Sequence, residues 1–222
     1  MLTEKSTPDE LRYVNKLCIE AKQPKDISDR LFRAKLAGKD RVLYRIKIKQ
    51  TNDTAIIIRD ANNPIMSPIM TLKGREGEGY AYLTPDGDIL ILESHAIRRY
   101  FNRHEHIPEE ECSHLDDIEP DYRRRVVNDM LFRLDTAVSV ANDLGTSDVC
   151  HFDGGVFLIS KEGKIGRFYT FIMNRQTFPD QRMRSLKSEQ YEKEIEKNRK
   201  YDKETDKMRA AINTFNVLSG RI

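Results

Sequence analysis

The sequence is poor in several features that mark particular classes of protein. It contains no Trp, only three cysteines in 222 residues, and no apolar run long enough to cross a membrane. Cys18, Cys112 and Cys150 form an odd and scattered set, which disfavours a disulfide framework and favours a reducing compartment. No secretory signal is visible ahead of the first polar segment. We therefore expect a cytoplasmic protein that does not enter a membrane.

Several catalytic signatures are also absent. The sequence has no Gly-x-Gly-x-x-Gly, no phosphate-loop lysine motif, no Gly-x-Ser-x-Gly and no His-Glu-x-x-His. These absences remove the usual sequence evidence for a nucleotide cofactor, an activated serine or a catalytic zinc. We expect no cofactor and no bound metal. The Glu-Gly-Glu-Gly segment at residues 76–79 indicates only a flexible turn.

The net charge is small, but the charges are unevenly distributed. The formal value of +2 is too low to indicate a nucleic-acid partner by itself. Residues 98–103 contain three arginines, residues 105–121 contain eight acidic residues without a Lys or Arg, and residues 123–125 are all Arg. The acidic block is read either as a solvated loop or as a docking surface for a basic partner.

Capping and stop signals predict three longer helices. The first begins with a capping box formed by Thr7 and Glu10, with Pro8 at the first helical position. The second runs from about residue 27 to residue 37 and ends at Gly38. The third begins at Pro120 and runs to about residue 144, and a short helix is expected near residues 107–111.

Strand signals lie between these helices. Alternation over residues 42–49 predicts a half-buried strand with a largely basic outer face, and residues 54–59 predict a second, more buried strand. Residues 61–79 are predicted as loop because Pro and Gly punctuate them. Two hairpins are expected, one joining residues 80–83 to 89–92 and the other joining residues 155–160 to 164–173.

These elements predict an α+β fold, with an antiparallel sheet, packed helices and a charged helical C-terminal extension. We divide the chain into N-terminal helices at 1–40, an α+β core at 41–175 and the extension at 176–222. The centre of residues 185–218 lacks a continuous apolar stripe. This part is therefore read as an outlying helix, a helical hairpin or a partner-binding tail.

The most informative stretch is residues 94–103, which follow a strand-like apolar run. If this stretch is helical, His95, Arg99 and Arg103 recur along one face, while Arg98 points off that face. His95 can carry a proton near neutral pH, and the arginines can grip phosphate. Metal-independent RNA cleavage needs a base, an acid and cations that hold the extra charge on phosphorus.

The same stretch, followed by Ile-Pro-Glu-Glu-Glu at 107–111, resembles small bacterial toxins of the barnase, colicin and RelE-type ribonuclease superfamily. In that pattern a His-Ala-x-x-Arg-x-x-x-Arg helix precedes a short helix and a sheet whose last strand carries a Thr. The matching positions are His95, Ala96, Arg99 and Arg103, then the second hairpin with Thr170. The resemblance covers about residues 89–173.

The resemblance implies a metal-independent endoribonuclease that acts on RNA or on ribosome-associated mRNA, with His95 and Thr170 meeting across the site. Arg98, Arg167 and Tyr169 are second-choice substrate-binding residues. Because Arg167 and Tyr169 alternate with Thr170, they are expected on the other face of the strand. The chain is longer than a free-standing toxin and carries a long helix between the two motifs.

Other readings stay open. His95 can cap or bond locally, the arginines can pair with the acids just downstream, and Thr170 can be an ordinary strand residue. The alternative function is a non-catalytic protein-binding or assembly module that uses the acidic loop and the charged C-terminal helix, with a protein partner such as an antitoxin. A zinc site is a further alternative, although its spacing is not that of a zinc finger; its candidate ligands are His104, His106, Cys112 and His114.

Overall fold

The protein is described by a computed structural model that covers residues 1–21, 27–36, 41–60, 67–84, 87–143, 149–152 and 154–176, together with residues 190, 193 and 197. The predicted helical character of the C-terminal extension lies outside the described residues, as does the expected end of the second helix at Gly38. The α+β class is confirmed.

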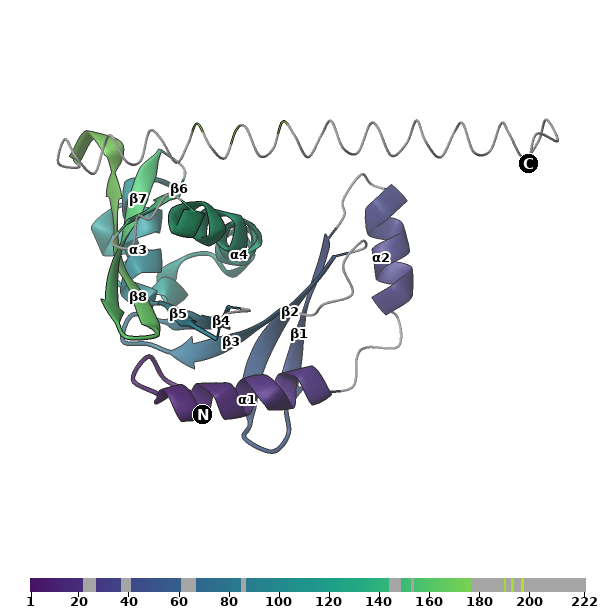
Figure 1. The fold of residues 1–222 in the computed structure, drawn as a ribbon. Helices are drawn as coiled ribbons and strands as arrows, with labels where there is room; N and C mark the ends of the chain where they lie inside the picture. Colours follow the sequence, from purple (N-terminus) through teal and green to yellow (C-terminus); the bar gives the residue numbers. More distant parts are fainter. Residues whose placement is uncertain are drawn as a thin grey trace, which may run out of the picture.

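An eight-stranded sheet organises the described part of the chain (Figure 1). Its spatial order is β1-β2-β3-β4-β5-β8-β7-β6. The strands are β1 (Arg41–Ile48), β2 (Asp53–Asp60), β3 (Ser67–Lys73), β4 (Glu78–Leu83), β5 (Ile89–Leu92), β6 (Val149–Phe152), β7 (Gly155–Glu162) and β8 (Ile165–Met173).

The sheet is mostly antiparallel, as expected, and contains one parallel pair. All neighbouring strands pair antiparallel except β5 and β8, which run parallel. A parallel pair requires a long crossover connection. Here the crossover contains α3 (Ser94–Arg103), the short helices η1 (Glu109–Glu111) and η2 (Leu115–Asp117), α4 (Pro120–Asp143), and the strands β6 and β7. A further short helix, η3 (Asn174–Gln176), follows β8.

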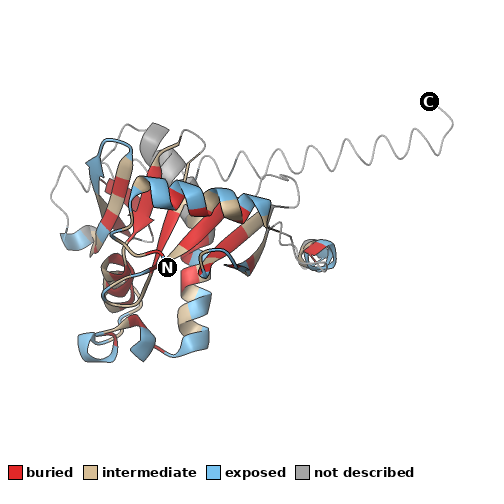
Figure 2. Cartoon of the chain, turned by 90° about the horizontal axis from the view of Figure 1, so that it is seen from below, coloured by how far each residue is buried: buried red, intermediate tan, exposed pale blue. Residues whose placement is uncertain are grey.

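Both faces of the sheet are covered. α1 (Pro8–Glu20) packs on one face, where Leu11, Val14 and Cys18 join a buried cluster with residues of β2 to β5. α3 and α4 cover the other face, where Phe101 and Met130 join buried aromatic residues of β7 and β8. Figure 2 shows the buried strands between helices whose outer sides are exposed. α1 therefore shares a core with the sheet.

Local signals predicted several elements well. The Thr7 side chain accepts a hydrogen bond from the backbone N–H of Glu10, and the Glu10 carboxylate accepts one from the backbone N–H of Thr7, which confirms the capping box. The second helix is α2 (Ile27–Leu36), and the long helix from Pro120 is α4. Both predicted pairs of hairpin strands are antiparallel neighbours. Tyr44 and Ile48 of β1 are buried while Arg45 and Lys47 are exposed, as the alternation predicted.

Two strands differ from the sequence interpretation. Residues 61–79 were expected to be loop, but β3 and the start of β4 lie within them. Pro68 is the second residue of β3, near the strand end where a missing N–H is tolerated, so it does not prevent pairing. β6 was not predicted from the sequence. The short helix expected near 107–111 is the single turn η1.

Candidate functional site

α3 positions the candidate site directly after β5. Ala96, Ile97, Tyr100 and Phe101 are buried against the sheet, which fixes the rotation of the helix. His95 is consequently left at the surface, with its side chain 39% exposed. Arg98 is buried. The helix pattern had predicted only that it points off the face that carries His95, Arg99 and Arg103.

The N-terminus of α3 is held by the N-terminal segment of the chain. Glu93 occupies the N-cap position without a side-chain cap bond, and the backbone N–H of Ser94 instead donates to the Glu4 carboxylate. The Arg167 guanidinium donates to the backbone carbonyl of Glu4 at 2.7 Å and lies 3.5 Å from the Glu93 carboxylate. Arg167 thus stabilises this helix end and does not meet His95.

Glu76 is the principal partner of His95. Nδ1 of His95 lies 3.0 Å and 3.1 Å from the two Glu76 carboxylate oxygens. A carboxylate at this position favours the imidazole tautomer with its hydrogen on Nδ1. In that tautomer Nε2 is the basic nitrogen. Nε2 has no hydrogen-bond partner among the described residues.

The buried side chain of Arg98 also contacts Glu76. Its Nε donates to Glu76 at 2.6 Å, and its Nη1 donates to Glu109 at 3.2 Å. Burial alone would raise the pKa of Glu76, but the hydrogen bonds from His95 and Arg98 outweigh it and lower that pKa. Burial opposes the charge of Arg98, yet its bonds to the two carboxylates raise the Arg98 pKa. Glu76 is therefore ionised and Arg98 charged at neutral pH.

The two outer arginines differ in their surroundings. Arg99 lies 3.4 Å from Glu109 through Nη1, and its Nε–H is covered and has no hydrogen-bond partner in the described part of the chain. Arg103 instead donates through Nη1 to the backbone carbonyl of Phe171 on β8, at 2.5 Å. Burial and the neighbouring Arg99 lower the pKa of Arg103. Arg103 thus ties α3 to β8.

Thr170 does not join His95. Phe171 belongs to the cluster that packs against α3, and successive side chains of a strand point to opposite faces. Thr170 therefore projects from the face of the sheet that α3 does not cover. This corrects the expectation, taken from the toxin resemblance, that His95 and Thr170 meet.

A β-bulge also changes the expected faces of β8. Thr170 and Phe168 pair with successive residues of β7, so Tyr169 is an extra residue in the ladder. Phe168 and Phe171 consequently share one buried cluster although they are three residues apart. Arg167 and Thr170 lie on the same face for this reason, against the simple alternation predicted from sequence. Tyr169 is 41% exposed, at the bulge.

The acidic block forms part of the structure and is not merely solvated. Glu109 pairs with Arg98 and Arg99, and Asp116 pairs with Arg123 at 2.6 Å. The Tyr122 hydroxyl donates to Glu105, and this burial and bonding raise the pKa of Tyr122 to about 12. Glu119 accepts from the first backbone N–H groups of α4. Within the described residues, the exposed carboxylates of Glu110 and Glu111 have no partner.

The candidate zinc ligands do not converge. His104 lies 2.9 Å from Glu105, while the Cys112 thiol is directed at the Ile107 carbonyl at 3.7 Å. His114 accepts from the backbone N–H of Asp116 and thereby caps η2. Across the described ranges, no group of three or more His, Cys, Asp or Glu side chains is arranged to hold a metal ion.

Glu76 is the site residue that sequence reasoning missed; the pairing of Arg98 with Glu109 is one of the downstream acid pairings that the sequence allowed. Glu76 was interpreted as part of a flexible turn. Charge complementarity with the arginines of residues 98–103 is the signal that allowed the pairing of Glu109. For Glu76, which lies 19 positions before His95, the sequence offers no local signal.

Comparison with protein-family models, curated proteins and solved structures finds no match for this chain. Among the described residues, no helix combines the length and apolar character needed to span a membrane.

Proposed function

We propose that this chain is a metal-independent endoribonuclease in which His95 carries the proton. The observation that carries the proposal is the pairing of His95 Nδ1 with the Glu76 carboxylate, which leaves Nε2 basic on a half-exposed side chain. An imidazole oriented in this way by a carboxylate is suited to general acid–base chemistry.

The proposed step uses the RNA's own 2′-hydroxyl. Nε2 of His95 takes the 2′-hydroxyl proton while the 2′-oxygen bonds to the adjacent phosphorus. The bond from phosphorus to the 5′-oxygen breaks, and that oxygen takes a proton from solvent or from the imidazolium. The products are a 2′,3′-cyclic phosphate and a 5′-hydroxyl end. Arg99, one turn from His95, is the cation placed to hold the added charge on phosphorus.

The remaining residues have other roles in this proposal. Glu76 and Arg98 are positioning residues, because they contact His95 or its partner and are themselves buried or half-buried. We assign no role in the reaction to Arg103 or Thr170. Glu109 pairs with both the buried Arg98 and the neighbouring Arg99.

The test is cleavage of a labelled single-stranded RNA by the intact chain in the presence of EDTA. His95→Asn retains a donor near Glu76 and removes Nε2, so we expect cleavage to fall by about 10²–10⁴-fold. His106→Asn is the matched control, since His106 is exposed and its backbone has a φ of +57°, which Asn tolerates. Equal cleavage by the wild type and His95→Asn would refute the proposal.

A second candidate function is a non-catalytic binding or assembly module. One observation favours it: the side chains of Arg98 and Arg103 donate to groups of this chain, so neither is free to bind a phosphate. A measurement of RNA binding to the intact chain distinguishes the two candidate functions before cleavage is measured, because only the ribonuclease requires RNA binding. An intact, folded chain that neither binds nor cleaves RNA would favour the binding module.

A further inference from the structure

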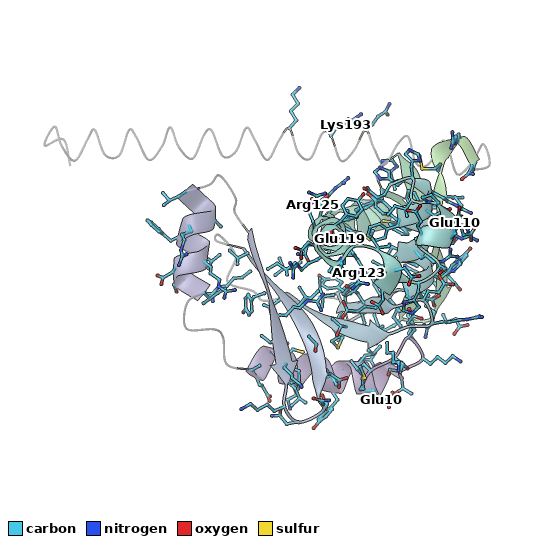
Figure 3. All side chains as sticks on the ribbon, turned by 180° about the vertical axis from the view of Figure 1, so that it is seen from behind. Glu10, Glu110, Glu119, Arg123, Arg125 and Lys193 are labelled. Atoms are coloured by element: carbon cyan, nitrogen blue, oxygen red, sulfur yellow. The ribbon has the colours of Figure 1, made fainter. Side chains whose placement is uncertain are left out.

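A separate cavity of about 600 Å³ lies between the sheet and the start of α4. Residues of β1 to β4 form one wall, and residues of η2 and of the first turns of α4 form the other. Figure 3 shows Arg123 at this junction of α4 and the sheet. This volume is within the usual range of about 300–1,000 Å³ for small-molecule sites.

The charges that line the cavity leave an excess of positive charge. Arg45 forms two hydrogen bonds of 3.1 Å to Glu78, and Arg123 pairs with Asp116, so these two acids are neutralised within the wall. Lys73 lines the cavity, is exposed, and has no ion pair or hydrogen bond from its ammonium group to any described residue. Arg124, 63% exposed, adds a second cation, and its partner Asp121 does not line the cavity.

Asp53, the third acidic residue that lines the cavity, binds the N-terminal segment of the chain. Asp53 is 3% exposed and accepts the backbone N–H of Leu2 at 2.5 Å. It is therefore committed to holding the N-terminal segment on β2. Lys73 and Arg124 remain the two lining cations without a partner in the lining itself.

The wall of the cavity is preorganised. The Tyr80 hydroxyl donates to Glu78 at 2.6 Å, and Glu78 is held in turn by Arg45. Burial and the adjacent Glu78 raise the pKa of Tyr80, so the phenol stays neutral. Pro120 is exposed and adds an apolar side chain to the lining, whereas Leu115 and Val127, which also line the cavity, are almost fully buried. A ligand with one anionic end and one apolar end fits this combination.

We propose that this cavity binds a small phosphate monoester of mononucleotide size. Lys73 and Arg124 bind the phosphate, because an ammonium group and a guanidinium group are the side chains that best match its charge and oxygens. Pro120, an exposed apolar side chain of the lining, contacts one face of the base. The turn at residues 74–77 contributes to both sites: Gly74 and Gly77 line the cavity, while Glu76 contacts His95. The binding proposal does not depend on cleavage at His95.

The test is calorimetric titration of the intact chain with AMP, with adenosine as the neutral comparison. We expect AMP to bind at least about tenfold more tightly than adenosine, because only AMP carries the phosphate. Lys73→Gln and Arg124→Gln should each weaken AMP binding by about tenfold or more. Lys161→Gln, an exposed lysine on the β7–β8 hairpin, is the matched control and should bind AMP like the wild type.

Three results would overturn this proposal: no AMP binding, equal binding of AMP and adenosine, or Lys73→Gln binding AMP as tightly as Lys161→Gln. His95→Asn separates it from the proposed ribonuclease function. This variant should bind AMP with wild-type affinity even though RNA cleavage is lost. Failure of cleavage in the wild type leaves the AMP titration fully informative.

Discussion

The Nδ1 atom of His95 lies 3.0 Å from Oε1 of Glu76, although the two residues are 19 positions apart. Two hydrogen bonds hold the turn that carries Glu76. The backbone carbonyl of Glu76 accepts from the N–H of Leu115 at 2.7 Å, and the backbone N–H of Glu76 donates to the Ser94 hydroxyl at 3.3 Å. The orientation of His95 therefore depends on contacts among the β3–β4 turn, α3 and η2.

We predict that Glu76→Gln lowers the free energy of unfolding by about 1–3 kcal/mol near neutral pH, because buried Arg98 loses a charged partner. The difference should depend on pH. The folded-state pKa of Glu76 is lowered below its ordinary value of 4.5, so its contribution is present above about pH 4.5 and is lost as the pH falls through the lower folded value. Urea unfolding from about pH 7 down to about pH 3 measures this difference.

The control for this prediction is Glu110→Gln, since Glu110 is exposed and, in the described structure, has no ion-pair partner. It should change stability little at any pH. If the difference in free energy of unfolding between Glu76→Gln and the wild type stays constant down to about pH 3, the pairing described for Glu76 is contradicted.

A second prediction concerns Gly77, which has a φ of +129° and faces Leu115. A Cβ on Gly77 would lie 2.6 Å from the Leu115 Cβ. Gly77→Ala should therefore destabilise the fold by about 2–3 kcal/mol, through backbone strain and a steric clash together. Gly163→Ala is the control, because Gly163 also has a positive φ but has open space around it. It should cost only about 1 kcal/mol.

Chemical or thermal unfolding of the two alanine variants compares these effects directly. Equal destabilisation at both positions would show that the contact with Leu115 contributes nothing. Gly77→Ala should also reduce RNA cleavage if the proposed function holds, because the same turn carries Glu76.

Sequence reasoning succeeded where the signal is local. The capping box of Thr7, the helix at residues 94–103 and the long helix from Pro120 depend on residues within a few turns of one another. The strands of the two hairpins are likewise adjacent in sequence. Such features follow from helix and strand periods and from turn chemistry, which a single sequence displays.

The features that were missed depend on contacts between distant segments. Residues 67–73 form a strand because β2 and β4 pair with both of its edges, and this pairing outweighs the Pro and Gly signals around it. The bulge at Tyr169 exists only in the pairing of β7 with β8. The contact between His95 and Glu76 is of the same kind, because it joins two segments that are 19 positions apart in the sequence.

A third prediction follows from the position of Thr170. Since Thr170 projects from the face that α3 does not cover, Thr170→Val should leave RNA cleavage within about twofold of the wild type. Val preserves the β-branched shape that suits a strand, so the fold should be retained. The measurement is the initial rate with the same RNA substrate. A loss of tenfold or more would show that the hydroxyl acts in the site and would contradict this placement.

The last prediction separates Arg99 from Arg103, which the sequence pattern treated as equivalent. Arg103 donates to the carbonyl of Phe171, so Arg103→Gln should lower the free energy of unfolding by about 1–2 kcal/mol while leaving RNA affinity nearly unchanged. Arg99 makes only a 3.4 Å contact with Glu109, so Arg99→Gln should change stability by about 0.5 kcal/mol or less.

RNA binding should show the opposite order for these two variants. Arg99→Gln should weaken binding and reduce the slope of log affinity against log salt by about 1, because one phosphate contact is lost. Filter binding at several salt concentrations, with unfolding measured on the same preparations, gives both quantities for each variant. If Arg103→Gln lowers the salt slope and Arg99→Gln does not, the phosphate contact belongs to Arg103, and the tie between α3 and β8 must open when RNA binds.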